Sequence, residues 1–272
     1  MMSALIRHNV KITGNGTTPM LFAHGFGCDQ NMWRLIAPDF ANDYKVVLFD
    51  YVGHGRSDFS AYNRARYSSL EGYADDVLGI CEELDLHDVV LVGHSVSAMI
   101  GILAAIREPQ RFQKLILVGP SPCYINDGDY VGGFTRGSID ELLEFLDSNH
   151  LGWSSAMAPV IMGNAERPEL GAELASSFCR TDPEVAQQFA RVTFLSDTRP
   201  DLPKLTVPSL IIQCSDDIIA PSCVGQYMHG QLTDSRLTIL NANGHCPHLS
   251  EPAETVKAMK KFLANTGGLG GK

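Results

Sequence analysis

Four short runs of consecutive apolar residues stand out along the chain, at residues 46–49, 89–92, 115–118 and 210–212. Because these runs are continuous rather than alternating, they are typical of strands that are covered on both faces. Segments of helical length, with apolar residues every three or four positions, separate them, as at residues 70–84. Strands that alternate with helices predict βαβ units and a largely parallel sheet.

Weaker patterns extend this arrangement at both ends of the chain. Residues 5–13 alternate loosely between apolar and polar positions, which suits an antiparallel edge strand. Short strands are expected at residues 20–22 and 237–240, and a helix at 252–263. The sequence therefore predicts an α/β fold with a mostly parallel central sheet and helices on both faces.

The strand and helix alternation stops after Gly119 and resumes only at Pro208. Stretches with helical periodicity occur in between, at residues 139–146, 170–178 and 184–195. Four prolines interrupt the same region: Pro159, Pro168, Pro183 and Pro200. An insertion of this length is too long for an idle loop, and ligands of open α/β sheets bind at the carboxyl ends of the strands. We therefore expect a helical cap over that edge.

The domain organisation follows from this interpretation. We expect a core formed by residues 1–121 and 206–264, a cap formed by residues 122–205, and a flexible tail at residues 265–272. The tail has the sequence NTGGLGGK from residue 265 onward, which contains few side chains that could pack.

Composition and charge narrow the classes of function. Hydrophobic residues make up 44% of the chain and charged residues 19%, as in a soluble globular protein rather than a disordered, collagenous or disulfide-dense one. The count of 21 Lys and Arg against 31 Asp and Glu gives a net charge of −10, which repels nucleic acid and anionic membranes. No apolar run has the length of a membrane span or a signal peptide. Seven cysteines without a Cys-x-x-Cys pair favour free thiols and a cytoplasmic location.

A Gly-x-Ser-x-small motif, GHSVS at residues 93–97, lies between a predicted strand and a predicted helix. A tight turn at this position raises the serine hydroxyl to the carboxyl edge of the sheet. The helix that begins there directs backbone N–H groups toward an anion formed beside the serine. Ser95 is therefore the candidate nucleophile, although Ser97 stands where the general motif has glycine. The alternative is a serine that only caps the helix.

A serine nucleophile needs a base within hydrogen-bonding distance. Of the nine histidines, only His245 and His248 follow the last predicted strand. We choose His245 because it comes first and is preceded by an Asn-Gly turn. The alternative, a metal site formed by His245, Cys246 and His248, lacks a fourth ligand at suitable spacing, so no metal is expected.

The acid that orients this histidine should lie between the serine and the histidine in the chain. Asp216 and Asp217 both follow the apolar run at residues 210–212. Asp217 is preferred because the apolar segment after it, at residues 218–221, would shield its hydrogen bond from water. Asp216 is then a turn or capping residue. The alternative, in which Asp216 orients the histidine and Asp217 forms the turn, stays open.

Acyl transfer also requires donors for the oxyanion. The sequence HGFGC at residues 24–28 follows the short strand at 20–22, and its glycines allow close approach of the backbone to a ligand. The amides of Phe26 and Val96, the residue after the nucleophile, are the natural pair. No glycine cluster is placed like a dinucleotide fingerprint or a P-loop, so no cofactor is expected.

Five longer motifs carry a resemblance to a known family: HGFGCDQ from residue 24, FDYVGHG from 49, GHSVSAMIG from 93, GPSPCYIND from 119 and GHCPHL from 244. The chain resembles an α/β-hydrolase over nearly its whole length. It is similar to the family that contains the bacterial stress regulator RsbQ and the plant strigolactone and karrikin receptors. This resemblance implies a V-shaped cap of four helices above an enclosed apolar pocket, with the triad at its floor.

The aromatic residues of the cap suit such a pocket, although packing between cap and core would explain them equally well. The expected lining residues are Phe26, Tyr124, Phe134, Trp153, Phe178, Phe189, Phe194 and Ile218. Of these, Phe26, Trp153 and Phe194 are preferred.

Two functions are compatible with the sequence. The first is a serine hydrolase that cleaves a small apolar ester or lactone. The second, implied by the resemblance, is a signalling receptor that binds a small hydrophobic ligand and a protein partner with little turnover. In RsbQ that partner is a phosphatase upstream of a stress sigma factor, and the resemblance implies a similar role in stress or small-molecule signalling.

Overall fold

The computed structural model describes residues 3–264, and the tail predicted at residues 265–272 lies outside them. The seven strands of the described residues are β1 (Lys11–Thr13), β2 (Pro19–Ala23), β3 (Lys45–Leu48), β4 (Val89–His94), β5 (Phe112–Val118), β6 (Ser209–Asp216) and β7 (Ser235–Asn243). They form one sheet in the order β1-β3-β2-β4-β5-β6-β7, in which only β1 is antiparallel to its neighbour. The predicted α/β fold with a mostly parallel sheet is confirmed.

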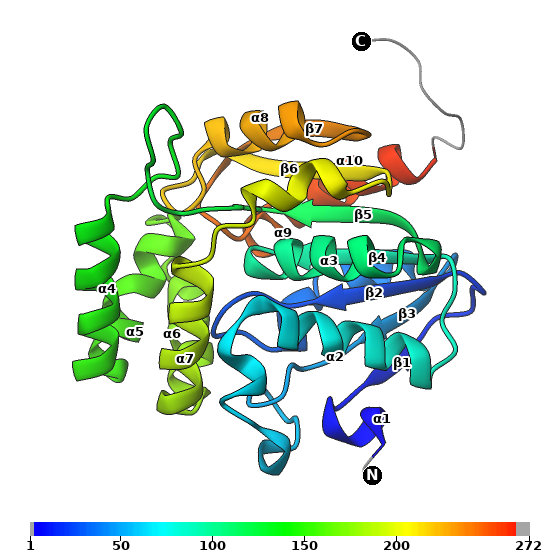
Figure 1. The fold of residues 1–272 in the computed structure, drawn as a ribbon, viewed down its shortest axis with the longest axis horizontal. Helices are drawn as coiled ribbons and strands as arrows, with labels where there is room; N and C mark the ends of the chain where they lie inside the picture. The colour runs from blue at the N-terminus through cyan, green and yellow to red at the C-terminus, as the bar shows by residue number, and fades with distance from the viewer. Residues whose placement is uncertain (1–2, 265–272) are drawn as a thin grey trace.

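Helices cover both faces of this sheet (Figure 1). The helices of the core are α1 (Ala4–Arg7), α2 (Leu70–Glu83), α3 (Val96–Arg107), α8 (Ser222–Gln231), α9 (Pro247–Ser250) and α10 (Pro252–Leu263). Leu91 on β4 packs into the cluster that contains α2, α3 and α8, whereas the next residue, Val92, packs with Met259 of α10. Successive side chains of a strand point to opposite faces, so both must be apolar here. This explains the continuous apolar runs of the central strands.

The edge of the sheet differs from the sequence prediction. The expected strand at residues 5–13 is wrong in its first half, because Ala4–Arg7 form a helical turn and only Lys11–Thr13 pair with β3. The hydroxyl of Ser3 accepts a hydrogen bond from the Leu5 amide, and the Ala4 amide donates to Glu83 of α2. These contacts fix the first turn as a helix against α2. The antiparallel pairing itself is confirmed.

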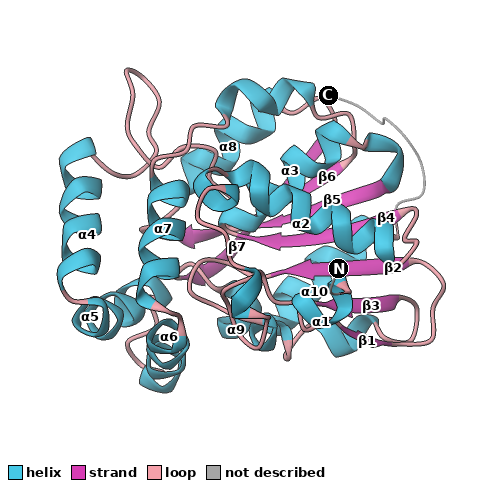
Figure 2. Ribbon diagram, turned by 60° about the horizontal axis from the view of Figure 1, so that its bottom comes forward, coloured by secondary structure: helices cyan, strands magenta, loops and turns pink. Residues whose placement is uncertain are grey.

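Four helices lie between β5 and β6: α4 (Arg136–Ser148), α5 (His150–Met162), α6 (Pro168–Arg180) and α7 (Pro183–Phe194). Figures 1 and 2 show them together at one end of the molecule, beyond the carboxyl ends of the strands. The helical periodicity of the sequence indicated α4, α6 and α7. It did not indicate α5, which is apolar on most of its circumference, so the contrast between faces is weak.

The prolines of this region act differently from one another. Pro168 and Pro183 occupy the first turns of α6 and α7, where a missing N–H has no cost. Pro159 was expected to interrupt a helix, and this was wrong, since it lies inside α5. Both Pro159 and Ser155, four residues earlier, are exposed, so the carbonyl that loses its donor faces solvent. The helix therefore continues through the proline.

No helix among residues 3–264 is both long enough and apolar enough to cross a membrane.

Candidate active site

The turn between β4 and α3 holds Ser95 in a conformation that residues other than glycine rarely adopt. Its φ is 56° and its ψ is −123°, which costs on the order of 1–3 kcal/mol. A Cβ on Gly93 would collide with the carbonyl oxygen of Ser97, so the strand and helix meet this closely only because residue 93 is glycine. The Ser95 side chain makes no capping hydrogen bond to α3. The tight turn leaves its hydroxyl free for another partner.

Ser97, which stands where the general motif has glycine, has a structural function. Its hydroxyl donates to the carbonyl oxygen of His24, and it lies 3.1 Å from the hydroxyl of Tyr51. The serine therefore joins the start of α3 to the loop after β2. Because that loop also carries Phe26, this contact fixes one candidate oxyanion donor relative to the other.

The partner of Ser95 is His245, in the loop after β7. The Nε2 atom of His245 lies 2.8 Å from the Oγ of Ser95, and its Nδ1 lies 2.7 Å from Oδ2 of Asp217. All three side chains are buried. The structure thus brings together the serine, histidine and aspartate that the sequence placed after three different strands, in one chain of hydrogen bonds.

The two adjacent aspartates at the end of β6 have different environments. Asp217 is buried, and its second oxygen, Oδ1, accepts hydrogen bonds from the amides of Ile219 at 2.8 Å and Ala220 at 3.1 Å. Asp216 is exposed and is the last residue of the strand. Because three donors hold the carboxylate of Asp217, its orientation toward His245 is fixed. The carboxylate of Asp216 makes no hydrogen bond to the imidazole of His245, whose ring nitrogens bind Asp217 and Ser95.

The loop that carries His245 is attached to the cap. The His245 amide donates to the carbonyl oxygen of Ile161 at 2.9 Å, and the side chain of Asn164 donates to the carbonyl oxygen of Asn243 at 3.0 Å. Gly244, with a φ of 83°, lies so close to the end of α5 that a Cβ would overlap the Met162 carbonyl. The position of the histidine therefore depends on α5.

We expect Gly244→Ala to lower kcat for ester hydrolysis by about 10²-fold, because a displacement of His245 by about 1 Å is enough for such a loss. Gly128→Ala is the matched control, since Gly128 also has a positive φ but a Cβ there would meet open space. Steady-state kinetics with p-nitrophenyl acetate would measure both. Equal kcat values for the two variants would show that contact with α5 does not position the histidine.

Two backbone amides beside Ser95 lack acceptors. Val96 is the first residue of α3, so its N–H has no partner within the helix. Among the described residues, neither the Val96 amide nor the Phe26 amide donates a hydrogen bond. An anion beside Ser95 would be the acceptor that these two donors lack.

A narrow cavity of about 30 Å³ opens onto Ser95 and His245. Besides Ser95 and His245, the residues that line the cavity are Phe26, Cys28, His94, Tyr124, Ile161, Leu174, Phe178, Thr193, Phe194, Ile219 and Cys246. The hydroxyl of Tyr124 lies 3.4 Å from the Oγ of Ser95, and burial raises the pKa of this tyrosine to about 12. Four of the expected lining residues, Phe26, Tyr124, Phe178 and Phe194, therefore border the cavity.

The other four expected lining residues do not border it. The ring of Trp153 packs against that of Phe26, with ring centroids 5.8 Å apart. The ring of Phe189 stacks on that of Tyr73 of α2, with ring centroids 4.5 Å apart. Both rings join cap to core, as the alternative interpretation held. Phe134 is half-buried outside the cavity wall, and Ile218 is 47% exposed.

Seven lining residues were missed, and none of them is Phe, Tyr or Trp: Cys28, His94, Ile161, Leu174, Thr193, Ile219 and Cys246. A search for aromatic residues alone overlooks them. Ile219 lines the cavity in place of its neighbour Ile218, because the turn after Asp217 points alternate side chains inward and outward. The sequence shows only that residues 218–221 are apolar, not which of them faces the cavity.

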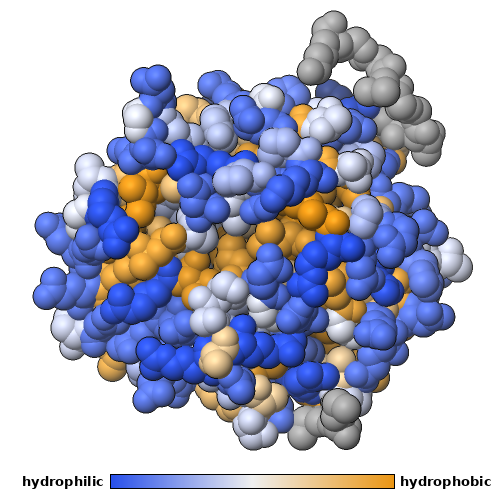
Figure 3. All heavy atoms as spheres, in the orientation of Figure 1, coloured by the Kyte–Doolittle hydropathy of each residue, from blue (hydrophilic) through white to orange (hydrophobic). Residues whose placement is uncertain are grey.

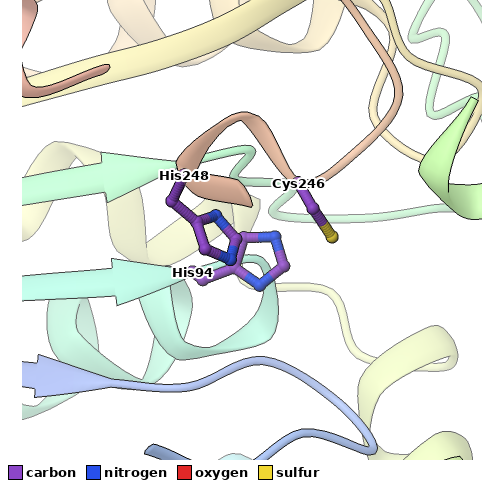
Figure 4. A group of neighbouring side chains, drawn as sticks. All are labelled: His94, Cys246 and His248. Carbon is purple, nitrogen blue, oxygen red and sulfur yellow. The ribbon is translucent and has the colours of Figure 1, made fainter. Parts of the chain in front are cut away.

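Next to the triad lies a second group of potential ligands, formed by His94, Cys246 and His248 (Figure 4). Their ligand atoms lie within 4.8 Å of one another, and all three side chains are buried. The metal alternative considered from the sequence is wrong in one member, because both ring nitrogens of His245 bind Asp217 and Ser95 instead. Burial lowers the pKa of His248 to about 3, so this imidazole is neutral. Trp33 packs against it with ring centroids 4.8 Å apart.

Comparison with known proteins identifies the family of the chain. Residues 20–258 match the model of the alpha/beta hydrolase family, and the chain belongs to that family. It is an α/β hydrolase by fold and by sequence.

Its relatives include plant receptors. The chain is 39% identical to Karrikin insensitive 2 receptor CA of Petunia hybrida, over 94% of this chain and 95% of the receptor. It is 38% identical to Strigolactone esterase D14 of Arabidopsis thaliana, over 94% and 96% of the two chains. The solved structure of olei00960, a hydrolase from Oleispira antarctica, superposes with a TM-score of 0.94 at 44% identity and covers 97% of both chains. The resemblance to the strigolactone and karrikin receptors is confirmed.

Proposed function

We propose that the protein is a serine hydrolase that cleaves a small, mostly apolar ester or lactone, with Ser95 as nucleophile, His245 as base and Asp217 as orienting acid. The observation that carries this proposal is the continuous hydrogen-bond chain from Asp217 through His245 to Ser95, at 2.7 Å and 2.8 Å. A protein that only binds a ligand has no need of all three groups in this arrangement.

In the proposed mechanism, His245 Nε2 takes the proton of Ser95 as Oγ attacks the carbonyl carbon. The amides of Phe26 and Val96 donate to the oxyanion of the tetrahedral intermediate. His245 then gives its proton to the leaving oxygen, which departs and leaves an acyl group on Ser95. Water, deprotonated by His245, releases the acid in a second step. Asp217 stabilises the imidazolium throughout.

The size of the cavity supports a small substrate. A volume of about 30 Å³ has room for roughly two water molecules, so only a short acyl group fits without movement of the walls. Larger ligands require the cap aromatics to turn or α5–α7 to shift. The walls beside the triad are aromatic and aliphatic, which favours an apolar acyl group.

The direct test is the covalent intermediate. The purified protein is incubated with p-nitrophenyl acetate and with a synthetic butenolide of the strigolactone type, followed by intact mass measurement and peptide mapping. We expect an added acyl mass on Ser95 that is absent from Ser95→Ala. Absence of both an adduct and turnover with either compound would contradict the hydrolase proposal.

Asp217→Asn should lower kcat by roughly 10⁴-fold, because an amide cannot hold the imidazole in the same tautomer or stabilise its cation. Asp216→Asn is the natural control, since this exposed residue makes no hydrogen bond to the imidazole of His245, and its kcat should remain within about twofold of the wild type. Initial rates with p-nitrophenyl acetate would compare them. The opposite order would transfer the orienting role to Asp216.

A second candidate function is a receptor in stress or small-molecule signalling that hydrolyses its ligand slowly and contacts a protein partner. The plant relatives, a karrikin receptor and a strigolactone esterase, favour this function. Helices α4 and α5 expose the apolar side chains of Phe145, Leu151 and Val160. On the face that Figure 3 shows, hydrophobic residues lie exposed among the hydrophilic ones. A single rapid turnover followed by very slow product release would distinguish a receptor from an esterase with steady turnover.

A further inference from the structure

A hydroxyl group in the cavity wall has no hydrogen-bond partner. Thr193, on the last turn of α7, is 1% exposed, and its Oγ1 makes no hydrogen bond. A threonine inside a helix usually bonds the carbonyl one turn earlier, here that of Phe189, but Oγ1 does not do so. A buried hydroxyl without a partner destabilises a protein, so its presence needs an explanation.

The fold holds Thr193 in this position. One turn earlier on α7, Phe189 stacks on Tyr73 of α2 with ring centroids 4.5 Å apart. On the other side, Phe194 packs edge-on against Tyr124 at 5.1 Å. These contacts hold α7 against α2 before Thr193 and against the segment that follows β5 after it. The hydroxyl therefore cannot reach solvent by a small rotation of the helix.

The cavity is the place where the hydroxyl can find a partner. Thr193 lines it together with Ser95, His245 and a set of mostly apolar side chains. The other hydroxyl of the cap-side wall, that of Tyr124, already lies 3.4 Å from Ser95. Thr193 Oγ1 is thus an unpaired donor in a mostly apolar wall, and it makes no hydrogen bond to Ser95 or His245.

We propose that Thr193 is a specificity residue that donates a hydrogen bond to a second oxygen of the substrate, one that does not belong to the scissile ester or lactone group. The preferred ligand class is then an oxygenated ester or lactone, such as an alkoxy- or keto-acyl compound, rather than a plain alkanoate. This inference rests on the proposed hydrolase function and adds the polarity of the substrate to it. Shape alone would accept both ligand types, whereas the unpaired hydroxyl favours the ligand that supplies an acceptor.

The test uses two substrates that differ by one atom. In p-nitrophenyl methoxyacetate an ether oxygen replaces one methylene of p-nitrophenyl butyrate, so the two acyl chains have nearly the same shape. The kcat/KM ratio of the pair is divided by the ratio of their hydroxide-catalysed rates, which removes intrinsic reactivity. We expect this corrected ratio to favour methoxyacetate and to fall by roughly tenfold in Thr193→Val, which keeps the shape of the side chain. Thr193→Ser, which keeps the hydroxyl, should restore most of the preference.

Stability provides a readout that does not depend on catalysis. Thr198 is another buried threonine, but its hydroxyl donates to the carbonyl oxygen of Pro122 at 3.0 Å. Thr193→Val should leave Tm unchanged or raise it by a few degrees, whereas Thr198→Val should lower Tm, because it leaves a buried carbonyl with one donor fewer. A fall in Tm for Thr193→Val equal to that of Thr198→Val would show that the Thr193 hydroxyl already has a partner and would overturn the proposal.

Failure of this inference can be separated from failure of the hydrolase function. Binding of the two esters to the non-acylating Ser95→Ala variant is measured by calorimetry, with and without Thr193→Val. If Ser95 forms an acyl adduct but Thr193→Val changes neither the corrected ratio nor the binding preference, Thr193 does not select the ligand. If no adduct forms but Thr193→Val still abolishes the binding preference, the specificity residue stands and the hydrolase proposal fails.

Discussion

Ser95→Ala is expected to lose about 10⁶-fold in kcat for ester hydrolysis, while the protein stays folded. The Ser95 hydroxyl is the nucleophile of the proposed mechanism, and no other hydroxyl lies within hydrogen-bonding distance of His245 Nε2 among the described residues. The Tyr124 hydroxyl lies 3.4 Å from the Oγ of Ser95, but among the described residues it makes no hydrogen bond to His245, so it lacks the base that a hydroxyl nucleophile needs.

Two measurements would check this result. Steady-state rates with p-nitrophenyl acetate give the loss in kcat, and thermal unfolding shows whether the variant is folded. Alanine has to adopt the same left-handed backbone as Ser95, so Tm should change little. Activity close to that of the wild type in a folded variant would remove Ser95 from the mechanism.

The free energy of unfolding is expected to fall steeply as the pH is lowered from about 6.5. Burial lowers the pKa of His8 to about 4 and that of His54 and His248 to about 3. It also lowers the pKa of His24 and His94. Each of these groups takes up a proton near pH 6.5 when the chain is unfolded but stays neutral in the folded protein. The unfolded state therefore binds more protons below that pH, and stability decreases as the pH falls.

One buried acid acts in the opposite direction. Burial raises the pKa of Asp76 to about 6, so the folded protein binds this proton before the unfolded chain does, and stability increases as the pH falls through about 6 to 4. Each group contributes about 1.4 kcal/mol per pH unit in its range. Because the histidines outnumber this acid, the net loss between about pH 6 and 5 should be several kcal/mol, a large part of the stability of a typical domain.

Urea unfolding at a series of pH values would measure this slope. His54→Gln and His248→Gln each remove one titrating group, so each should reduce the slope by about one proton, whatever the variant does to stability at neutral pH. A wild-type slope near zero in this range would mean that the buried histidines are already protonated in the folded protein.

Much of the fold is visible in local sequence patterns. The continuous apolar runs predicted the central strands because both faces of a parallel sheet are buried, as Leu91 and Val92 illustrate. The sequence analysis interpreted Pro168 and Pro183 only as interruptions, whereas the structure places them in the first turns of α6 and α7. The first turn at residues 4–7 could not be predicted in this way, because its conformation depends on Glu83, which is distant in the chain.

Some features of the candidate site could likewise be predicted from local sequence, whereas others depend on residues that are distant in the chain. The sequence by itself predicted the candidate residues Ser95, Asp217 and His245, since each follows a strand whose carboxyl end lies at the same edge of the sheet. It also determined the tight turn, because only glycine fits at residue 93. The tertiary structure alone decided that Ile219 rather than its neighbour Ile218 faces inward. It also decided that the rings of Trp153 and Phe189 pack against other rings rather than line the cavity, and that the hydroxyl of Thr193 is left unpaired. The physical reason is that composition and spacing identify an apolar side chain, but its neighbours depend on how α4–α7 pack onto the core.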